Sequence, residues 1–401
     1  MLAGMITASC LTAIPVGAEK VYTNNRLTCS TYDLNRDGNV NVFDMISMRR
    51  FFMGTSSISE TDLANGEKID RIKFAVETYL TQSREYSARV KNVEIYSTTR
   101  DGVIQDNSIA VVEFDKELDE QAIEELIKGV DFDSTAIKEL AGKCRYLRIA
   151  LLNESVSAAV PSTESAYDTK TAITYPYSSD INMSDNHKAV LEKLDYTIRE
   201  DIADRSSDWY ARITDINYTL PSIDGSETPD FDNMIGTITF DTTFDERALQ
   251  LLSTAYDESY LDLYAGKSNQ LRVYLKSGST LVAVPVLDGS YSQTSTIYEE
   301  SDVALRTIRT KAISLLTYVS EEWYARVNSI DIDFDKETNT AEILVTFCRP
   351  LNEDIVKRFA LLSGIDDIDA EVDYALSNNI NQVKMIYNDG LINAVVPYLA
   401  T

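Results

Sequence analysis

A unit that occurs three times constrains this chain more than any other feature of its sequence. The copies open with YSARV at 86–90, WYARI at 209–213 and WYARV at 323–327, and they close with AAVP, VAVP and AVVP. From the arginine to the closing proline the three copies span 72, 73 and 71 residues (Arg89 to Pro161, Arg212 to Pro285 and Arg326 to Pro397). Near-constant spacing between matched landmarks predicts three structural copies. The pitches of 123 and 114 residues are too long for a solenoid, so each copy is predicted to be a small domain.

Each copy reads, in order, as strand, strand, helix, strand, strand. One antiparallel sheet with helices over one face buries such a pattern, so the predicted class is α+β with three ββαββ-type domains. A further helix is predicted before copies two and three, at 186–205 and 302–319. These helices either cover the open face of a sheet or lie between copies. Segment 69–84 stands in the same place before the first copy.

The predicted organisation has five parts. They are a leader at 1–18, a small all-α calcium-loop module at 19–85, repeat 1 at 86–175, repeat 2 with its preceding helix at 186–298, and repeat 3 with its preceding helix at 302–401. A length of 401 residues fits two or three globular units with hydrophobic cores.

The charge balance excludes several functions. The chain has 37 Lys and Arg residues against 64 Asp and Glu residues, a formal charge of −27. Nucleic acid and anionic membranes both require clustered basic residues, so neither is an expected partner. The single histidine, His187, argues against His-rich metal sites and catalytic triads. The four cysteines show no Cys-x-x-Cys spacing, and we expect no structural disulfides.

The first eighteen residues carry no charge and end in Val16-Gly17-Ala18, which resembles a signal-peptidase site. This pattern predicts export, with the mature protein secreted and extracellular. A disordered start, a membrane-anchoring start and a lipoprotein site at Cys10 are the alternatives.

An oxygen-rich loop at 33–44 is the strongest chemical signal. Side chains that carry oxygen stand at loop positions 1, 3, 5, 9 and 12, a glycine at position 6 permits the sharp turn, and position 7 adds a backbone carbonyl. The predicted ligands of one Ca²⁺ are Asp33, Asn35, Asp37, Asn39, Asn41 and Asp44. Position 12 is usually Glu, so the shorter Asp44 requires the following helix to lie closer to the ion. The alternative is an Asn/Asp-rich turn without metal.

The segment DLNRDGNVNVFDMISMRRFF at 33–52 resembles one repeat of a type I dockerin, the calcium module that attaches cargo to cohesin domains of cellulosomal scaffolds. The resemblance covers residues 33–54 closely and implies that Val42, Phe43, Arg49 and Arg50 face the cohesin. Core packing for Val42 and Phe43, and a solvated face for the arginines, are the alternatives. A dockerin normally has a second repeat. Here 65–70 keeps only a turn, followed by a helix that is a degenerate partner of the first or part of repeat 1.

Three recurring features of the copies have a catalytic or binding interpretation beside a structural one. Arg89, Arg212 and Arg326 either clamp a carboxylate or pair with a neighbouring acid or aromatic ring, and we favour the second. Asp119-Glu120 and Asp245-Glu246 suggest hydrolytic carboxylates, but Asn352 replaces the aspartate in copy three, so helix caps are favoured. The aromatic residues at 209–210 and 323–324 either stack on sugar rings or pack between domains, and packing is favoured.

The predicted function is therefore calcium-dependent attachment to a cohesin, with a non-catalytic repeat region for adhesion or for binding protein or plant polysaccharide. The alternative is a polysaccharide-degrading glycoside hydrolase of a cellulosome, whose catalytic carboxylates the sequence does not reveal.

Overall fold

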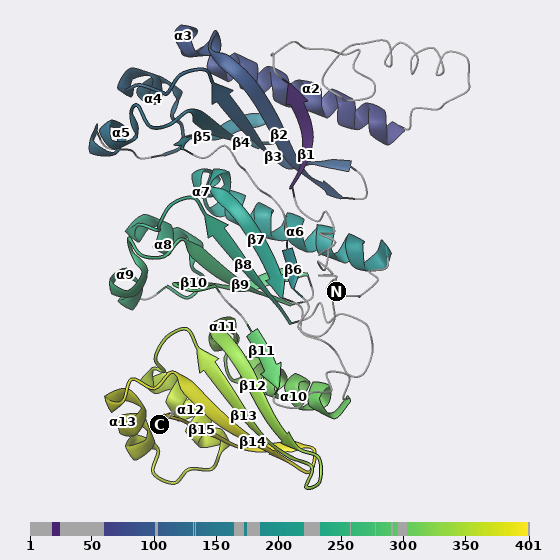
Figure 1. Ribbon diagram of the computed structural model, residues 1–401, viewed down its shortest axis with the longest axis vertical. Coiled ribbons are helices and arrows are strands. Elements are labelled where there is room, and N and C mark those ends of the chain that lie inside the picture. The colour runs from purple at the N-terminus through teal and green to yellow at the C-terminus, as the bar shows by residue number, and fades with distance from the viewer. Residues whose placement is uncertain are drawn as a thin grey trace, which may run out of the picture.

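A computed structural model describes residues 18–24, 60–100, 103–130, 132, 134–163, 172–174, 185–219, 233–256, 258–276, 278–289, 292–295 and 303–399. These residues form three five-stranded sheets, one for each sequence repeat. The sheets lie one above another as layers, in the order of the chain (Figure 1). The α+β class and the three antiparallel sheets predicted from the repeats are confirmed.

The first layer has strand order β1-β2-β3-β4-β5 and antiparallel pairing throughout. Its strands are β1 (Ala18–Asn24), β2 (Val90–Arg100), β3 (Val103–Phe114), β4 (Tyr146–Leu152) and β5 (Ser155–Ser162). Its helices are α2 (Glu60–Leu80), α3 (Arg84–Ser87), α4 (Glu120–Leu126) and α5 (Ser134–Leu140).

The second and third layers repeat this plan. The second contains β6 (Ala172–Thr174), α6 (Asp185–Arg205), α7 (Ser207–Ala211), β7 (Ile213–Thr219), β8 (Met234–Phe240), α8 (Glu246–Leu252), α9 (Ser259–Tyr264), β9 (Gln270–Lys276) and β10 (Ser279–Val286). The third contains β11 (Ser292–Ser295), α10 (Val303–Val319), α11 (Glu321–Ala325), β12 (Val327–Asp335), β13 (Thr340–Phe347), α12 (Glu353–Leu362), α13 (Ile368–Ser377), β14 (Gln382–Asn388) and β15 (Leu391–Pro397).

The observed unit is richer than the predicted ββαββ. Two helices, not one, join the second and third strands of each repeat, and a fifth strand lies at the edge of each sheet. This edge strand precedes the repeat in sequence: β6 pairs in parallel with β7, and β11 pairs in parallel with β12. Residues 172–174 and 292–295 thus pair within the sheet that follows them. The edge strand of the first sheet, β1, comes from the segment that the sequence analysis assigned to an all-α module.

Alternation fixes which side chains of each strand enter the core. In β13 the buried residues are Ala341, Ile343, Val345 and Phe347, while the residues between them are at least partly exposed.

Matching hairpins close the last strand pair of the first and third layers. Asn153 and Glu154 join β4 to β5, Asp389 and Gly390 join β14 to β15, and all four have positive φ, as a type I′ turn requires.

Helices cover both faces of the first two sheets, which corrects the prediction of helices over one face. The alternating residues of the first sheet divide between two clusters. Val93, Ile95 and Val112 pack with α2, whereas Ile109 and Val111 pack with α6 and α7 of the second repeat. The helices that precede copies two and three therefore lie between copies (Figure 1).

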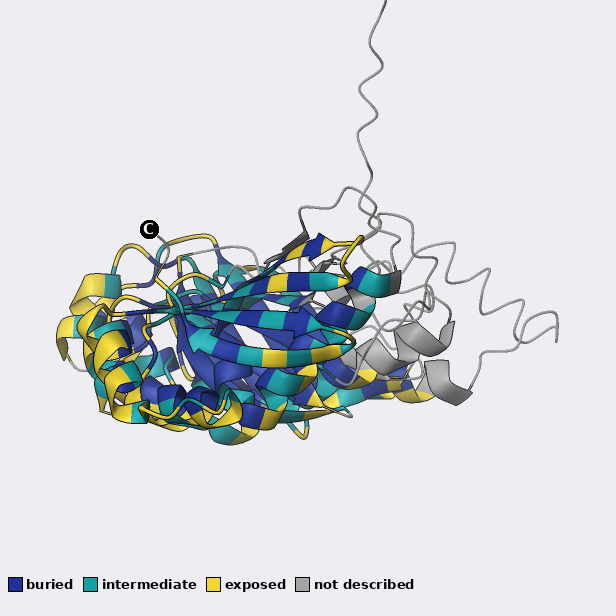
Figure 2. Cartoon of the chain, turned by 90° about the horizontal axis from the view of Figure 1, so that it is seen from below, coloured by how far each residue is buried: buried dark blue, intermediate teal, exposed yellow. Residues whose placement is uncertain are grey.

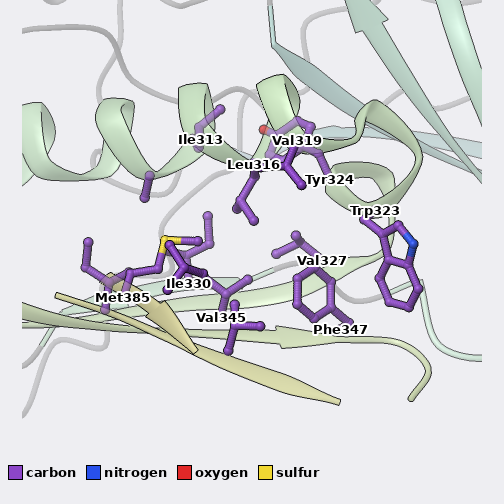
Figure 3. Packing of buried hydrophobic residues seen from close by; sticks show 14 of the residues in the cluster. Ile313, Leu316, Val319, Trp323, Tyr324, Val327, Ile330, Val345, Phe347 and Met385 are labelled. Carbon is purple, nitrogen blue, oxygen red and sulfur yellow. The ribbon is translucent and has the colours of Figure 1, made fainter. Parts of the chain in front are cut away.

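The third layer has a core of the same kind. Figure 3 shows Leu316 of α10 pointing toward Ile330, Val345 and Met385 of the sheet, whereas Ile313 lies on the opposite side of the helix. Burial of these apolar side chains on both sides of each inner helix joins the layers into a stack.

The outer face of the third sheet differs from the faces inside the stack. Figure 2 views the molecule from below, and strands on this side alternate between buried and more exposed residues. Glu342 and Lys384 lie on this face and form an ion pair of 2.6 Å, with 61% and 27% of their side chains exposed. A polar outer face suits a sheet of a stacked array that no described layer covers.

Candidate functional site at the repeat junctions

The predicted calcium ligands and the predicted cohesin-facing residues all lie between residues 33 and 50, outside the described residues. The structure does describe the segment that follows. Asn65–Asp70, predicted as a turn, is part of α2, which begins at Glu60.

Helix α2 is built into the first repeat. Ile69, Ile72 and Val76 are buried in the core of the first layer. Tyr79 donates a hydrogen bond of 2.7 Å to the carbonyl of Leu126, and the Asn65 amide oxygen accepts one of 2.9 Å from the backbone N–H of Ile104. The helix thus occupies the place that α6 and α10 have before the later repeats, in line with the interpretation that it serves repeat 1.

An aromatic pair recurs at the start of each repeat. Tyr86, Trp209 and Trp323 each meet the phenylalanine at the end of the second strand edge to face, with ring centroids 5.5, 5.3 and 5.3 Å apart. The partners are Phe114, Phe240 and Phe347, and Figure 3 shows the last pair. Trp209, Tyr210, Trp323 and Tyr324 are all buried. These rings are packing groups, as favoured from the sequence, and offer no exposed platform for a sugar.

The arginine that follows each aromatic residue changes with its position in the stack. Arg89, which has no described layer above it, is 36% exposed and pairs with Glu85 and Asp115. Arg212 is 10% exposed and bonds Asp241 at 3.4 Å. Arg326 is fully buried, pairs with Glu322 at 2.7 Å, and donates to the hydroxyl of Tyr260 in the preceding repeat. Pairing with acids and aromatic rings is therefore confirmed. Arg212 and Arg326 are more buried than Arg89 because the preceding layer covers them.

A second arginine lies on the strand that follows the two short helices, β4 in the first sheet and β9 in the second, and it bonds the next repeat rather than the preceding one. Arg148 is fully buried and pairs with Asp241 of the second repeat at 3.1 Å. Arg272, its counterpart by strand register, is also fully buried and donates to the carbonyl of Val327 at 2.7 Å and to Asn328 at 3.2 Å. Neither was predicted from the sequence, because a charged residue inside a strand is usually interpreted as solvent-facing. The signal was available in their matched position, since the spacing from Arg148 to Pro161 equals that from Arg272 to Pro285.

The aspartates of the suspected hydrolytic pairs are helix caps, and Glu120 and Glu246 are exposed in the first turn of the same helices. Asp119, Asp245 and Asn352 precede α4, α8 and α12, and their side-chain oxygens accept backbone N–H bonds of 2.9, 2.7 and 3.0 Å. An N-cap of this kind satisfies a donor that the helix leaves unpaired. The cap interpretation is confirmed in all three copies.

A cleft of about 510 Å³ opens at the junction between the first and second repeats. Its buried wall includes Trp209 and Arg212, and Glu139, Asp245 and Arg247 are exposed at its rim. Two of its carboxylates are engaged: Asp241 is bonded by two arginines and Asp245 caps α8. The cleft thus combines an aromatic wall and a fixed guanidinium with no evident pair of acid and base, which suits binding better than catalysis.

A second cleft, of about 730 Å³, lies beside α2 and the β4–β5 hairpin. Phe74 of α2 lines it and is 66% exposed. Arg71 and Glu154, joined by an ion pair of 2.5 Å, also line it.

Three other features limit the chemistry of the described residues. No group of three or more His, Cys, Asp and Glu residues among them is placed to hold a metal ion. Cys144 and Cys348 are free thiols, and burial raises the pKa of Cys144 to about 11, so its unreactive neutral form prevails at neutral pH. None of the described helices has the length and apolar character needed to cross a membrane.

Comparisons with protein-family models, curated proteins and solved structures found no match for this chain.

Proposed function

We propose that this chain is an exported protein that attaches to a cohesin-bearing scaffold through its calcium loop and carries a non-catalytic repeat region. The observation that supports attachment is the loop at 33–44, with six oxygen ligands in one register and a helix-forming segment directly after it. Calcium would neutralise Asp33, Asp37 and Asp44 and fix the start of the segment that contains Arg49 and Arg50. Without metal, these carboxylates repel one another and the loop loosens.

The use of α2 by the first repeat supports a one-site module. Its buried face is occupied by the core of the first layer, and its side chain Asn65 bonds the backbone of β3. The residues available for docking are then those of the first calcium loop and its helix. The expected stoichiometry is one Ca²⁺ and one cohesin for each chain.

The non-catalytic character of the repeats is supported by the roles of their carboxylates. The aspartates of the pairs that suggested hydrolysis, Asp119 and Asp245, cap helices, and Asp241 is held between two arginines. A retaining or inverting glycosidase needs two carboxyl groups available to the substrate.

The test uses the full chain in calorimetric titration with Ca²⁺ and in pull-downs against a panel of cohesins, with and without chelator. We expect uptake of one Ca²⁺, capture that chelator abolishes, and strong weakening by Asp33→Ala. Glu124→Ala, which removes one exposed acid from α4, is the matched control and should leave capture unchanged. Capture that persists in chelator excludes the proposed mechanism. Release of reducing sugar from plant polysaccharide by the pure chain would instead favour the hydrolase.

A further inference from the structure

The second short helix of the repeat is the same element in the first two layers, so its residues can be matched one by one. Helix α5 is followed by Gly142, whose N–H donates 2.8 Å to the carbonyl of Leu118, and α9 by Gly266, whose N–H donates 2.8 Å to the carbonyl of Phe244. Both glycines have positive φ, as helix ends of this kind require. Counting back six residues from each glycine aligns Ala136 with Tyr260.

Tyr260 fills the junction between the second and third repeats. Its side chain is fully buried, and its hydroxyl accepts a hydrogen bond from Arg326. The Arg326 guanidinium carbon lies 5.2 Å from the centroid of the Tyr260 ring, within the range of a cation–π contact. Tyr256 and Tyr264 flank the same ring edge to face, at 5.7 and 5.6 Å. A phenol group thus completes the contacts of the arginine at this junction.

The junction between the first and second repeats has the arginine but lacks the phenol. Ala136 lines the cleft of about 510 Å³ described above, a volume within the roughly 300–1,000 Å³ of small-molecule sites. Arg212 lies in the position of Arg326, and its guanidinium carbon is 5.7 Å from the rings of both Phe132 and Trp209. A single methyl group therefore stands where the other junction has a ring and a hydroxyl.

We propose that the cleft between the first and second repeats binds a ligand carrying a phenol ring, the group that Tyr260 supplies at the next junction. The ring packs between the apolar wall and the face of the Arg212 guanidinium, and the phenol oxygen accepts a hydrogen bond from that guanidinium. The acids Glu139, Asp208 and Asp245 line the same cleft and disfavour ligands that carry a carboxylate. A tyrosine side chain of a peptide and a free phenolic compound share this chemistry. The site does not depend on the attachment proposed above.

The first experiment is calorimetric and NMR titration of the full chain with p-cresol, with toluene and with N-acetyl-tyrosinamide. We expect one p-cresol per chain and at least about tenfold weaker binding of toluene, because toluene lacks the oxygen that accepts from a charged donor. Binding of N-acetyl-tyrosinamide as tight as that of p-cresol identifies a peptide tyrosine as the ligand. Binding of p-cresol alone identifies a free phenolic compound. Absence of p-cresol binding overturns the proposal.

Two variants locate the site. Ala136→Tyr places the missing ring in the cleft and should abolish p-cresol binding, whereas Lys138→Tyr, on an exposed position of the same helix, should leave it unchanged. Tyr260→Ala opens the second junction and should raise the stoichiometry from one p-cresol to two. If Tyr260→Ala fails to fold, the Ala136→Tyr and Lys138→Tyr pair still decides the matter. Unchanged binding in Ala136→Tyr, or binding that appears only in Tyr260→Ala, contradicts the assignment.

Discussion

The sheet faces inside the stack and the face at its end use the same register position in opposite ways. Arg148 and Arg272 stand on the fourth strand of the first two sheets, are fully buried, and bond the next repeat. Lys384 stands at the matching position of the third sheet, opposite Val396, and pairs with the exposed Glu342 of its own sheet. Arginine offers five donors on a planar group that several acceptors can share, whereas lysine is strongly hydrated. Arginine therefore occupies this position where another layer covers the sheet, and lysine occupies it where no described layer does.

The largest expected effect comes from the acid that two arginines share across the first junction. Asp241→Ala leaves Arg148 and Arg212 without their carboxylate inside the stack, and we expect a loss of about 3–5 kcal/mol in the free energy of unfolding. Urea denaturation followed by circular dichroism measures it. The counterpart Asp115→Ala removes an acid that is 55% exposed beside Arg89, and should cost no more than about 1 kcal/mol. Equal costs for the two substitutions would break the comparison between covered and uncovered positions.

The next effect concerns the second junction. Arg272→Ala removes a buried guanidinium that donates to Val327 and Asn328, and leaves a cavity. We expect a loss of about 3 kcal/mol, because hydrogen bonds from a charged donor contribute about 1.5–3 kcal/mol and the cavity adds to the cost. The same denaturation curves provide the value. A change below about 1 kcal/mol would mean that apolar packing alone holds the third layer.

A smaller effect, about 1 kcal/mol, is expected from each helix cap. Asp245→Ala in the second repeat and Asn352→Ala in the third remove side-chain bonds that lie within their own repeats. The two losses should match, because neither bond depends on a neighbouring layer. Thermal unfolding of both variants checks this. Clearly unequal losses in the free energy of unfolding would show that the contribution of a cap depends on its position in the stack.

The smallest effect is expected at the end of the stack. Lys384→Ala removes one partner of a surface ion pair, so the loss should stay within about 1 kcal/mol and decrease further in high salt. Unfolding at low and high ionic strength measures both. A loss as large as that of Arg272→Ala would mean that the outer face is covered in solution.

Local features of the repeat were predictable because they recur three times in sequence. The caps, the aromatic rings at the repeat starts and the arginine after each ring were read from single segments, and each acts mainly on its own neighbourhood. The class and the three sheets were also predictable, since alternation over strands such as β13 shows which residues are buried.

What the sequence did not reveal depends on contacts between layers. The edge strands β6 and β11 are only three and four residues long and take their pairing from a sheet that follows them in the chain. Helices α6 and α10 cover the second face of the first and second sheets. The pattern of their apolar residues does not predict which sheets they contact. The difference between Ala136, which lines the cleft, and Tyr260, which is buried, has meaning only once the two helices are placed at their junctions. The calcium loop stays a prediction.

The uncovered third face also says what shortening the chain would do. A product ending near Leu287 would present Ile235, Tyr274, Val282 and Val284, now buried against α10 and α11, as a solvent-facing apolar surface together with Arg272. Such a product would have a built-in tendency to self-associate and precipitate, whereas the outer face of the third sheet carries the charged pair of Glu342 and Lys384. The third repeat thus shields the second sheet from solvent, and its loss would be penalised by aggregation rather than by loss of the first two cores.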